Sequence, residues 1–364
     1  MKRVLVAMSG GVDSSVTALL LQRQGYECVG VTMRLQDTLI AKGARPEPLN
    51  HDAEDARRIC DQLGMEFHAV DFSHTFEKEV VEKFVEYYEN GWTPNPCVEC
   101  NRELKFGRLL QAADKYGCEY LATGHYAQVI KNENGIYQLQ RAANIKKDQS
   151  YVLFNLNQPI LSRLLFPIGT MESKDAVRAY AEKEGLITAQ KTDSQDICFI
   201  PDGNYVRFIE RYEGKASEPG EFMDVEGHVI GKHMGAIRYT IGQRRGIGIP
   251  ASEPLYVTGK NMETNQVFIG KKADLYTTAL LARDWNWIGE PATESFRACV
   301  KVRYNAKEAP CTVTPLPMEN HRGREVISVR VDFDEPQRAV APGQAAVAYR
   351  GNQVLGGGTI IQVG

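Results

Sequence analysis

The sequence predicts an α/β protein in which a parallel, doubly wound sheet domain comes first, a small middle domain follows, and a C-terminal β-barrel-like domain comes last. Two observations lead to this prediction. Strand-like apolar runs alternate with helical segments through the first third of the chain, which is typical of a parallel sheet covered on both faces. After about residue 204, short strand-like runs separated by glycines replace this alternation. The expected domains are residues 1–203, 204–278 and 279–364.

The elements of the first domain follow from their periodicity. KRVLVAM predicts a strand, and SSVTALLLQRQG predicts a helix whose Val16, Leu19 and Leu20 share one face. ECVGVTM predicts the next strand. DAEDARRICDQLG and EFHAVDF repeat the helix and the strand, two further helices are expected near residues 75–90 and 101–116, and EYLATGHY predicts another strand. The aperiodic stretch 36–51 is expected to be a surface loop over the carboxyl edge of the sheet, where such folds bind ligands.

The later elements read as strands. EFMDVEGHVIG, PLYVTGK and QVFIGKK are short apolar runs bounded by glycines, and they predict the strands of the middle domain. FRACVKVRY, EVISVRVDF and AAVAYRGNQVLGGGTIIQV predict the strands of an antiparallel barrel or sandwich. With 364 residues and a hydrophobic fraction of 43%, the chain is long enough for each domain to have a packed core.

Composition narrows the class of protein. The formal net charge of −3 argues against a basic coat, so a nucleic-acid partner would be bound by local patches. No apolar run is long enough to span a bilayer, and the N-terminus enters a strand without the pattern of a targeting peptide. Eight cysteines, mostly alone in apolar surroundings, suit a reducing compartment. We therefore expect a cytoplasmic monomer with no membrane contact.

The turn MSGGVDSS, residues 8–15, lies between the first strand and the first helix. Gly10 and Gly11 let the backbone approach a ligand closely, and the amides at the start of the helix point toward any anion bound there. Asp13 would repel a phosphate unless it holds a divalent metal or fixes the turn. The G-x-x-x-x-G-K-[ST] pattern is absent, which disfavours kinase-type phosphoryl transfer. The turn resembles instead the pyrophosphate loop of ATP pyrophosphatases; the ordinary alternative is a tight turn before a helix.

Three cysteines have unusual surroundings. Cys97 and Cys100 lie in GWTPNPCVECNRELKFG, where prolines restrain the backbone and a helix is expected to begin near Asn101. A cysteine at a helix N-terminus has a stabilised thiolate, and Cys100 fits this description best. Cys198 lies in the loop-like DSQDICFIP. The ordinary alternative for the C-x-x-C pair, a structural zinc site, lacks a second pair of ligands. The other five cysteines fit strand or helix patterns and are expected to be buried and inert: Cys28, Cys60, Cys118, Cys299 and Cys311.

Seven motifs together resemble the tRNA-specific 2-thiouridylases, in the same order and at similar spacing: MSGGVDSS, TPNPCVECNRELKFG, LATGHYAQV, KKDQSYVLF, KTDSQDICFIP, YTIGQRRGIGI and KVRYNA. The resemblance implies that the protein uses ATP to activate O2 of the wobble uridine in certain tRNAs and replaces this oxygen with sulfur delivered as a cysteine persulfide. It further implies Mg²⁺ to neutralise the departing pyrophosphate, a tRNA substrate, and a persulfide donor such as a cysteine desulfurase or a sulfur relay protein.

The resemblance also assigns residues. Cys198 corresponds to the persulfide carrier and Cys100 to its partner thiol. Because Cys198 bears the transferable sulfur, Cys100 could release it by attack or close a disulfide afterwards. The ATP contacts fall on Ala7, Met8, Ser9, Gly10, Gly11, Val12, Asp13, Ser14, Met33 and Gly124. The tRNA contacts fall on Asn95, Pro96, Cys97, Lys147, Asp148, Gln149, Arg303, Tyr304 and Gln344.

Position 97 departs from the pattern of many family members, which have an aspartate there. The cysteine creates a set of three thiols, Cys97, Cys100 and Cys198, with the ligand count of a [4Fe–4S] cluster that keeps one iron open. A cluster-dependent thiolase is therefore an alternative to the persulfide route. The glycine turn by itself would also suit a different adenylating ATP pyrophosphatase, or an ATP-binding module without chemistry, which would give Cys100 and Cys198 no role.

Overall fold

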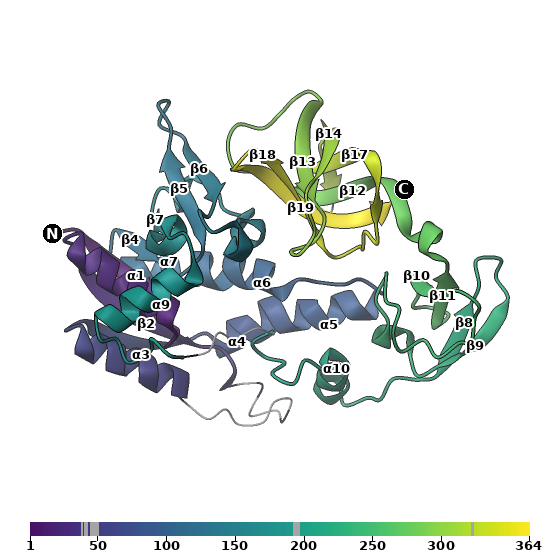
Figure 1. Ribbon diagram of the computed structural model, residues 1–364, viewed down its shortest axis with the longest axis horizontal. Coiled ribbons are helices and arrows are strands. Elements are labelled where there is room, and N and C mark those ends of the chain that lie inside the picture. The colour runs from purple at the N-terminus through teal and green to yellow at the C-terminus, as the bar shows by residue number, and fades with distance from the viewer. Residues whose placement is uncertain (38, 40–42, 44–50, 192–196, 322–323) are drawn as a thin grey trace.

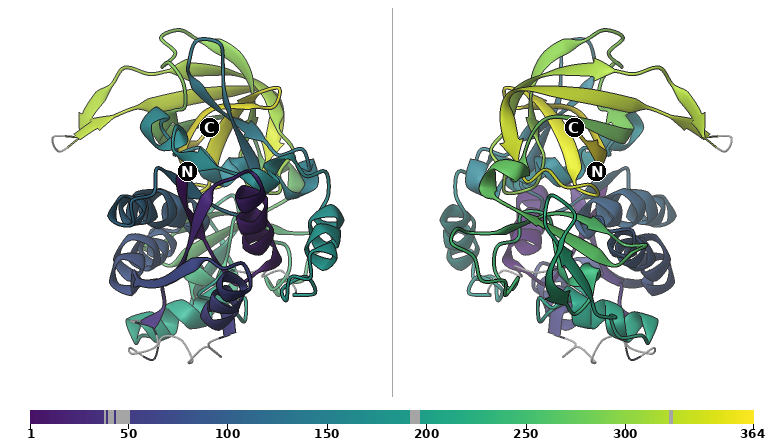
Figure 2. Two further views of the ribbon diagram at one scale, coloured as in Figure 1. Left: turned by 90° about the vertical axis from the view of Figure 1, so that its left-hand side faces the viewer. Right: turned by 90° about the vertical axis from the view of Figure 1, so that its right-hand side faces the viewer.

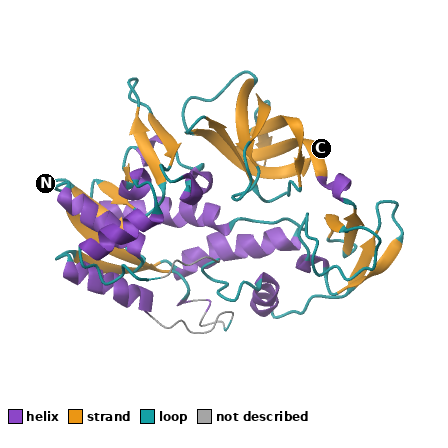
Figure 3. Ribbon diagram, in the orientation of Figure 1, coloured by secondary structure: helices purple, strands orange, loops and turns teal. Residues whose placement is uncertain are grey.

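The computed structural model describes the chain except residues 38, 40–42, 44–50, 192–196 and 322–323. Figure 1 shows three parts: a helix-covered sheet near the N-terminus, a barrel beside it, and a small sheet at the far end. Helices gather in the first part and strands dominate the other two, as Figure 3 shows. The predicted fold class, an α/β domain followed by two β-rich domains, is confirmed.

The first domain is built on five parallel strands. Side chains alternate across the central strand: Val4 and Val6 pack on one face of the sheet, and Leu5 packs on the other. Its strands, in spatial order, are β3 (Glu66–Asp71), β2 (Glu27–Arg34), β1 (Arg3–Ala7), β4 (Tyr120–Ala122) and β7 (Leu164–Leu165).

Helices cover both faces of this sheet (Figure 2). Those on the Val4 face are α1 (Val12–Arg23), α3 (His51–Gln62) and α9 (Lys174–Lys183). One continuous helix comprises α4 (Ser73–Phe76), the π-helical segment η1 (Glu77–Val81) and α5 (Glu82–Glu89). A second, whose Phe106 and Leu109 pack on the Leu5 face, comprises α6 (Pro96–Glu99), the π-helical segment η2 (Cys100–Arg108) and α7 (Leu109–Lys115).

The C-terminal domain is a closed, six-stranded antiparallel barrel, because its first and last strands pair with each other. A hairpin from the first domain extends the barrel sheet beside its last strand. The barrel strands, in spatial order, are β12 (Tyr276–Trp287), β17 (Ser328–Arg338), β14 (Ala309–Pro315), β13 (Phe296–Lys301), β18 (Ala345–Arg350) and β19 (Gln353–Val363). The hairpin strands are β5 (Ala127–Lys131) and β6 (Tyr137–Arg141).

The sheet domain and the barrel share a hydrophobic core. One cluster of buried side chains contains Leu5 of β1, Tyr151 between the two domains, and Val347 of β18. The hydroxyl of Tyr151 donates a hydrogen bond of 2.8 Å to the carbonyl of Ala345 in the barrel. Each domain also has a packed cluster of its own, as expected, and in the barrel it includes Val313 and Val331. The barrel in addition completes the burial of one face of the sheet domain.

The middle domain is a four-stranded sheet with its own cluster around Phe222, Val257 and Val267. Its strands, in spatial order, are β10 (Tyr256–Asn261), β11 (Gln266–Gly270), β8 (Gly220–Met223) and β9 (Val229–His233). The remaining elements are α8 (Gln158–Leu161), α10 (Tyr205–Glu213), β15 (Glu319–His321), β16 (Arg324–Val326), and the short 3-10 turns η3 (Ile145–Lys147), η4 (Ser150–Leu153), η5 (Pro167–Thr170), η6 (Ala236–Arg238) and η7 (Lys272–Leu275). None of the described helices is long and apolar enough to cross a membrane.

Candidate active site

The glycine turn after β1 has the form that the sequence predicts. Gly10 has φ +71°, and a Cβ atom at this position would lie 2.3 Å from the carbonyl oxygen of Asp52. Both the backbone conformation and the neighbouring chain therefore require glycine. Gly11 is the N-cap residue of α1, and it has no side chain that could cap the helix. The first-turn amides of α1 are thus left for another acceptor, which fits the phosphates of a nucleotide.

Serines hold the turn in shape. The hydroxyl of Ser14 donates to the carbonyl of Gly11 at 3.0 Å and accepts from the amide of Ser9 at 3.2 Å. The hydroxyl of Ser15 donates to the same carbonyl at 2.9 Å. Ser14 and Ser15 are buried, as are Met8 and Val12 on either side of the glycines. The turn is therefore a preorganised structure rather than a loop that must order around a ligand.

Asp13 is held by two side chains from distant parts of the chain. The Nζ atom of Lys174 lies 2.8 Å from each carboxylate oxygen of Asp13. The hydroxyl of Tyr126 donates to the same carboxylate at 2.7 Å. Of the two roles that the sequence leaves open for Asp13, metal binding and fixing of the turn, this arrangement favours the second, because an ammonium group already neutralises the carboxylate.

The other residues that the resemblance assigns to ATP lie at the same edge of the sheet. Ala7 is the last residue of β1, and Met33 lies near the end of β2, half-buried between two hydrophobic clusters. A Cβ atom on Gly124 would lie 3.0 Å from the main chain of Asp13 and Ser14. Gly124 therefore lets α1 pack directly against the chain that follows β4.

The predicted start of the helix near Asn101 is wrong. The helix begins at Pro96, with Asn95 as the N-cap residue, and the side chain of Asn95 accepts from the amide of Cys97 at 3.2 Å. Proline is well suited to the first position of a helix, because its missing N–H would have no partner there. The exposed Cys97, and not Cys100, lies in the first turn.

Cys100 lies one turn further along and is buried with 8% of its surface exposed. Burial raises the pKa of the Cys100 thiol, Cys97 adds to this effect, and Lys105 opposes it. The expected stabilised thiolate at Cys100 is therefore also wrong. In the resting protein Cys100 is a neutral thiol.

The exposed Cys198 lies at the edge of the cluster that contains Cys100, because Phe199 and Ile200 are buried in that cluster. The backbone carbonyl of Cys198 accepts from the side chain of Gln36 at 3.1 Å. Residues 192–196 of the same motif, and most of the predicted surface loop 36–51, lie outside the described residues.

The remaining cysteines fit the prediction of inert thiols with one exception. Cys28, Cys60, Cys118 and Cys311 are buried, and Cys299 on β13 is half-buried. Burial raises the pKa of Cys28, Cys60 and Cys311 to about 12. The four buried thiols serve as packing residues.

Relatives with known names match nearly the whole chain. The tRNA-specific 2-thiouridylase MnmA of Syntrophotalea carbinolica is 48% identical over 364 residues, covering 99% of this chain and 98% of the relative. MnmA of Carboxydothermus hydrogenoformans is 46% identical over 371 residues, covering 99% of this chain and 97% of the relative. MnmA of Lachnoclostridium phytofermentans is 42% identical over 367 residues, covering both chains completely. The chain belongs to the tRNA-specific 2-thiouridylase family.

Family models match the three parts of this 2-thiouridylase family member in order. They are described as a tRNA methyl transferase HUP domain at residues 2–202, a tRNA methyl transferase PRC-barrel domain at 206–271, and an aminomethyltransferase beta-barrel domain at 277–360. Among solved structures, a 4-thiouridine synthetase in complex with RNA and ATP covers 56% of this chain and 46% of its own, with 15% identity and a TM-score of 0.34. This overlap is too weak to add to the assignment.

Several residues that the 2-thiouridylase resemblance assigns to tRNA binding lie close together. The hydroxyl of Tyr304 donates to the backbone carbonyl of Asp148 at 3.2 Å. Burial raises the pKa of Tyr304, and Asp148 and Cys97 add to this effect. The Tyr304 side chain packs against the hydrophobic cluster that contains Val98 of α6. Lys147 and Arg303 are exposed next to this pair. The barrel, the η3 turn and the α6 turn thus meet around Tyr304.

Three of the assigned side chains are occupied within the protein. The carboxylate of Asp148 is buried and accepts from the amides of Ala142 and Ser150 and from the Ser150 hydroxyl. The side chain of Gln149 accepts from the amide of Tyr126 at 2.9 Å. The side-chain amide of Gln344 donates to the backbone carbonyl of Thr93. These contacts fix the turns, whereas Arg303 on the barrel is exposed to solvent.

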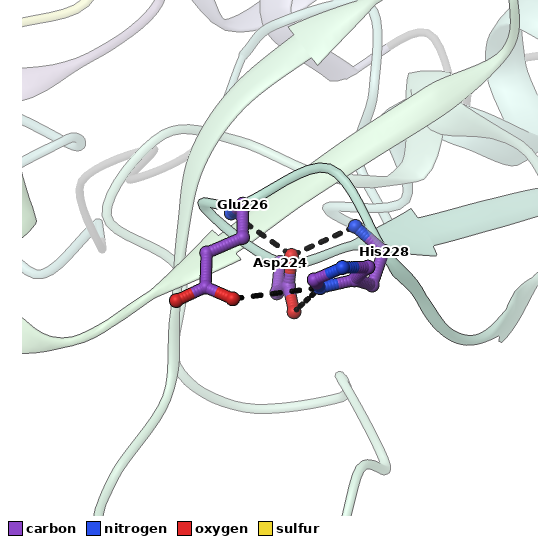
Figure 4. A group of neighbouring side chains, drawn as sticks. All are labelled: Asp224, Glu226 and His228. Carbon is purple, nitrogen blue, oxygen red and sulfur yellow. Dashed lines mark hydrogen bonds and ion pairs between the residues drawn. The ribbon is translucent and has the colours of Figure 1, made fainter.

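A group of metal-ligating side chains lies outside this region, in the loop between β8 and β9 (Figure 4). The carboxylate of Asp224 accepts from the amides of Glu226 and His228, at 2.9 and 2.8 Å, and lies 3.1 Å from His228 Nδ1. An aspartate that bonds the next amides in this way closes a tight turn. The exposed group is thus explained by its hairpin.

Sequence reasoning missed the two residues that hold Asp13, Tyr126 and Lys174. Tyr126 and His125 lie in the motif LATGHYAQV, where only Gly124 is assigned from the sequence. His125 is buried, its Nδ1 lies 2.6 Å from the Thr123 hydroxyl, and burial holds its pKa well below the ordinary value, so the ring is neutral. Lys174 opens a separate helix, and no local pattern connects it with Asp13.

Proposed function

We propose that this protein is the tRNA-uridine 2-sulfurtransferase that thiolates the wobble uridine, with ATP and a cysteine persulfide as co-reactants. The near full-length identity of 42–48% with the three named 2-thiouridylases carries this proposal. The local arrangement supports it, because one domain contains both a preorganised glycine turn and a hydrophobic cluster that includes Cys100 and the two residues after Cys198.

The first step is activation of the uridine. O2 of the base attacks the α-phosphorus of ATP, and pyrophosphate leaves from the site formed by Gly10, Gly11 and the first turn of α1. The helix amides carry partial positive charge and stabilise the departing anion without reorganisation. The adenylated oxygen becomes a good leaving group, which the free carbonyl oxygen is not. The base has to leave the anticodon loop stack, at a cost of a few kcal/mol.

The second step transfers sulfur. The terminal sulfur of a persulfide on Cys198 attacks C2 of the uridine, and AMP leaves. The Cys100 thiolate then attacks the inner sulfur, which breaks the S–S bond, leaves 2-thiouridine and forms a Cys100–Cys198 disulfide. A dithiol reductant supplies the two electrons that restore both thiols. Because the Cys100 thiol is neutral at rest, its proton must leave at this stage, and Lys105 favours the ionised form.

Replacement of the two thiols tests the proposal. The Cys198→Ser and Cys100→Ser variants should lose thiolation of a wobble uridine, measured by mass spectrometry of digested tRNA, and should still release pyrophosphate from ATP in the presence of tRNA. Cys28→Ser, which alters a buried packing thiol, is the matched control and should thiolate normally. Thiolation by Cys198→Ser would refute the persulfide role, and a chain that never consumes ATP with tRNA would refute the proposed function.

A second candidate is thiolation with a [4Fe–4S] cluster held by Cys97, Cys100 and Cys198. The observation that favours it is the placement of Cys97 in the first turn of the helix and Cys100 one turn later, so that two thiols share one helix face. When bound, such a cluster would carry sulfide on its open iron. An anaerobic preparation with absorbance near 400 nm and matched iron and sulfide would favour this candidate, and a colourless, active preparation would exclude it.

A further inference from the structure

Lys301, the last residue of β13, extends its side chain over two tyrosine rings where the barrel meets the sheet domain. Its Nζ atom lies 5.6 Å from the ring centroid of Tyr151 and 5.7 Å from that of Tyr304. The two rings contact each other edge to face, with centroids 6.0 Å apart, and Tyr151 is fully buried. The aromatic faces therefore hold this half-buried ammonium group at a defined place.

The ammonium group of Lys301 has no counter-ion of its own. It forms no hydrogen bond or ion pair with any residue that the structure describes. The carboxylate of Asp148 is occupied, because two backbone amides and the Ser150 hydroxyl donate to it. Burial lowers the pKa of Lys301; Asp148 opposes this effect, and Arg141 adds to it. The folded chain thus bears the cost of a half-buried, unpaired cation, which a bound anion would offset.

The neighbouring cation, Arg141, differs because it has a carboxylate partner. Its guanidinium group forms an ion pair with Glu308 and lies 4.1 Å from the ring centroid of Tyr349. The side chain of Arg141 is only 11% exposed. Arg141 is therefore neutralised within the protein, whereas the charge of Lys301 is available to a ligand.

The charges around Lys301 suit a polyanion. Three exposed cations lie on the two segments that meet here: Arg303 and Lys307 in the loop after β13, and Lys146 in η3. None of the three forms an ion pair with the described residues. Cations gathered without carboxylate partners are typical of a surface that binds the sugar-phosphate backbone of a nucleic acid. A phosphate is thus the anion that fits the ammonium group of Lys301.

The position of α6 indicates which part of an RNA would reach Lys301. Tyr304, whose ring lies under the ammonium group, packs against the hydrophobic cluster that contains Val98 of α6. The same helix continues directly into Cys100, one of the two thiols of the proposed sulfur transfer. The uridine must come close to these thiols, so the phosphates nearest to Lys301 are those beside this nucleotide.

We propose that Lys301 binds a phosphate of the anticodon loop directly beside the wobble uridine, and that the rings of Tyr151 and Tyr304 keep its ammonium group in position for this contact. This inference deepens the proposed function, since it rests on a tRNA substrate whose wobble uridine is thiolated. The barrel then fixes the backbone next to the base that has left the stack, which orients the base toward the nucleotide and the thiols. Lys301 is a substrate-binding residue and takes no part in proton or sulfur transfer.

Binding of an RNA hairpin tests the inference, with the anticodon stem and loop, an unmodified wobble uridine and several salt concentrations. Lys301→Met keeps an apolar chain against the rings and removes the charge. It should weaken binding by about tenfold and lower the steepness of log K against log salt by about 0.7 to 0.9, the contribution of one phosphate. Lys301→Arg should keep most of the affinity. Lys2→Met, which removes a lysine over the Tyr120 ring just before β1, is the matched control and should bind as the wild-type chain does.

Hairpins with one neutral methylphosphonate in place of a phosphate locate the contact. At the phosphate that Lys301 binds, this change should weaken binding to the wild-type chain about as much as Lys301→Met does, and should cost nothing further in the variant. We expect this non-additivity on the 5′ or the 3′ side of the wobble uridine.

Three results would overturn the inference: unchanged hairpin affinity in Lys301→Met, additive effects at both phosphates that flank the uridine, or a loss of ATP affinity in this variant, which would assign the lysine to the nucleotide. ATP binding, measured by calorimetry without RNA, should therefore be the same in Lys301→Met and in the wild-type chain. Failure of the wild-type chain to thiolate tRNA would instead refute the proposed function.

Discussion

The side-chain amide of Gln344 in the barrel donates a hydrogen bond of 2.7 Å to the backbone carbonyl of Thr93, across 251 residues of sequence. The amide of Thr93 in turn donates to the carbonyl of Pro342 at 2.9 Å. Gly343 has φ +88°, and a Cβ there would lie 2.9 Å from the Thr93 nitrogen. The barrel thus holds Thr93 by two hydrogen bonds, and Thr93 lies just before Asn95 at the start of α6. These contacts fix the position of α6 relative to the barrel.

Removal of this contact should destabilise the protein. Gln344→Ala leaves the partly buried Thr93 carbonyl without its side-chain donor, and we expect the free energy of unfolding to fall by about 1 kcal/mol in urea titrations. Gln337→Ala, which removes a solvent-exposed hydrogen bond to the backbone carbonyl of Glu335 in the same strand, is the control and should change little. Equal losses in the two variants would contradict this role of Gln344.

The two glycines Gly10 and Gly25 should respond differently to alanine. Both have positive φ, at +71° and +85°, so each substitution strains the backbone by about 1 kcal/mol. Only at Gly10 does the new methyl group also meet a neighbouring carbonyl, whereas at Gly25 nothing lies within 4 Å. Gly10→Ala should therefore lose ATP binding in calorimetry, and Gly25→Ala should bind ATP normally with slightly lower stability. Normal ATP binding by Gly10→Ala would count against the turn as the phosphate site.

Alkylation should distinguish the thiols of the site. Cys97 and Cys198 are exposed, while Cys100 is buried and its pKa is raised by that burial. With iodoacetamide at about pH 7.5, we expect Cys97 and Cys198 to react at least about ten times faster than Cys100, as followed by peptide mass spectrometry. The rate at Cys100 should rise only at a higher pH than the rate at an exposed cysteine does, because burial raises the pKa of the Cys100 thiol. Similar rates at all three cysteines in the folded chain would contradict the described burial.

Lys260 on β10 should make stability depend on pH. Its Nζ atom is buried without a hydrogen-bond partner among the described residues, and burial lowers its pKa to about 8. Below about pH 8 the ammonium group is charged in both states, and the folded state bears the cost of burying it. Between about pH 8 and about pH 10 only the unfolded chain keeps the proton, so this group makes the free energy of unfolding rise with pH.

The variant Lys260→Met checks this expectation. It should be more stable than the wild-type chain by about 2 kcal/mol at about pH 7, and the difference should shrink toward about pH 10. The exposed Lys232→Met on β9 serves as the control and should follow the wild-type curve in urea unfolding at both pH values. A loss of stability in Lys260→Met at neutral pH would show that the amine is satisfied in the folded protein.

The architecture is predictable because it depends on periodicity, which is local. The alternation that identifies β1, α1 and β2 is complete within about 30 residues. The β5–β6 hairpin is absent from the sequence prediction although its signal is present: Asn134 and Gly135 separate two strand-like runs, and Gly135 has φ +81°. The start of the helix at Pro96 is not predicted, because a proline is equally common in a restrained loop and in the first turn of a helix. Pro96 is the first residue of α6, so the helix begins earlier than expected.

The site is predictable only where one segment supplies it. The glycine turn follows from residues 8–15 and has the expected form. The partners of Asp13 are 113 and 161 residues away, and only the packing of α9 against α1 brings Lys174 to the turn. Likewise the burial of Cys100 depends on Phe76, Phe84 and Phe199, which the sequence around position 100 does not include.

The core that joins Leu5 to Val347 has a consequence for substrate choice. Because the barrel and the sheet domain share this core, folding fixes the distance between the glycine turn and Arg303. The distance between these two sites then does not adjust to the RNA that binds. Under the proposed function, a tRNA is a substrate when its backbone reaches Arg303 while its extruded base reaches the glycine turn. Because the protein does not adjust this distance, selection among tRNAs depends on how easily the anticodon loop deforms to match it.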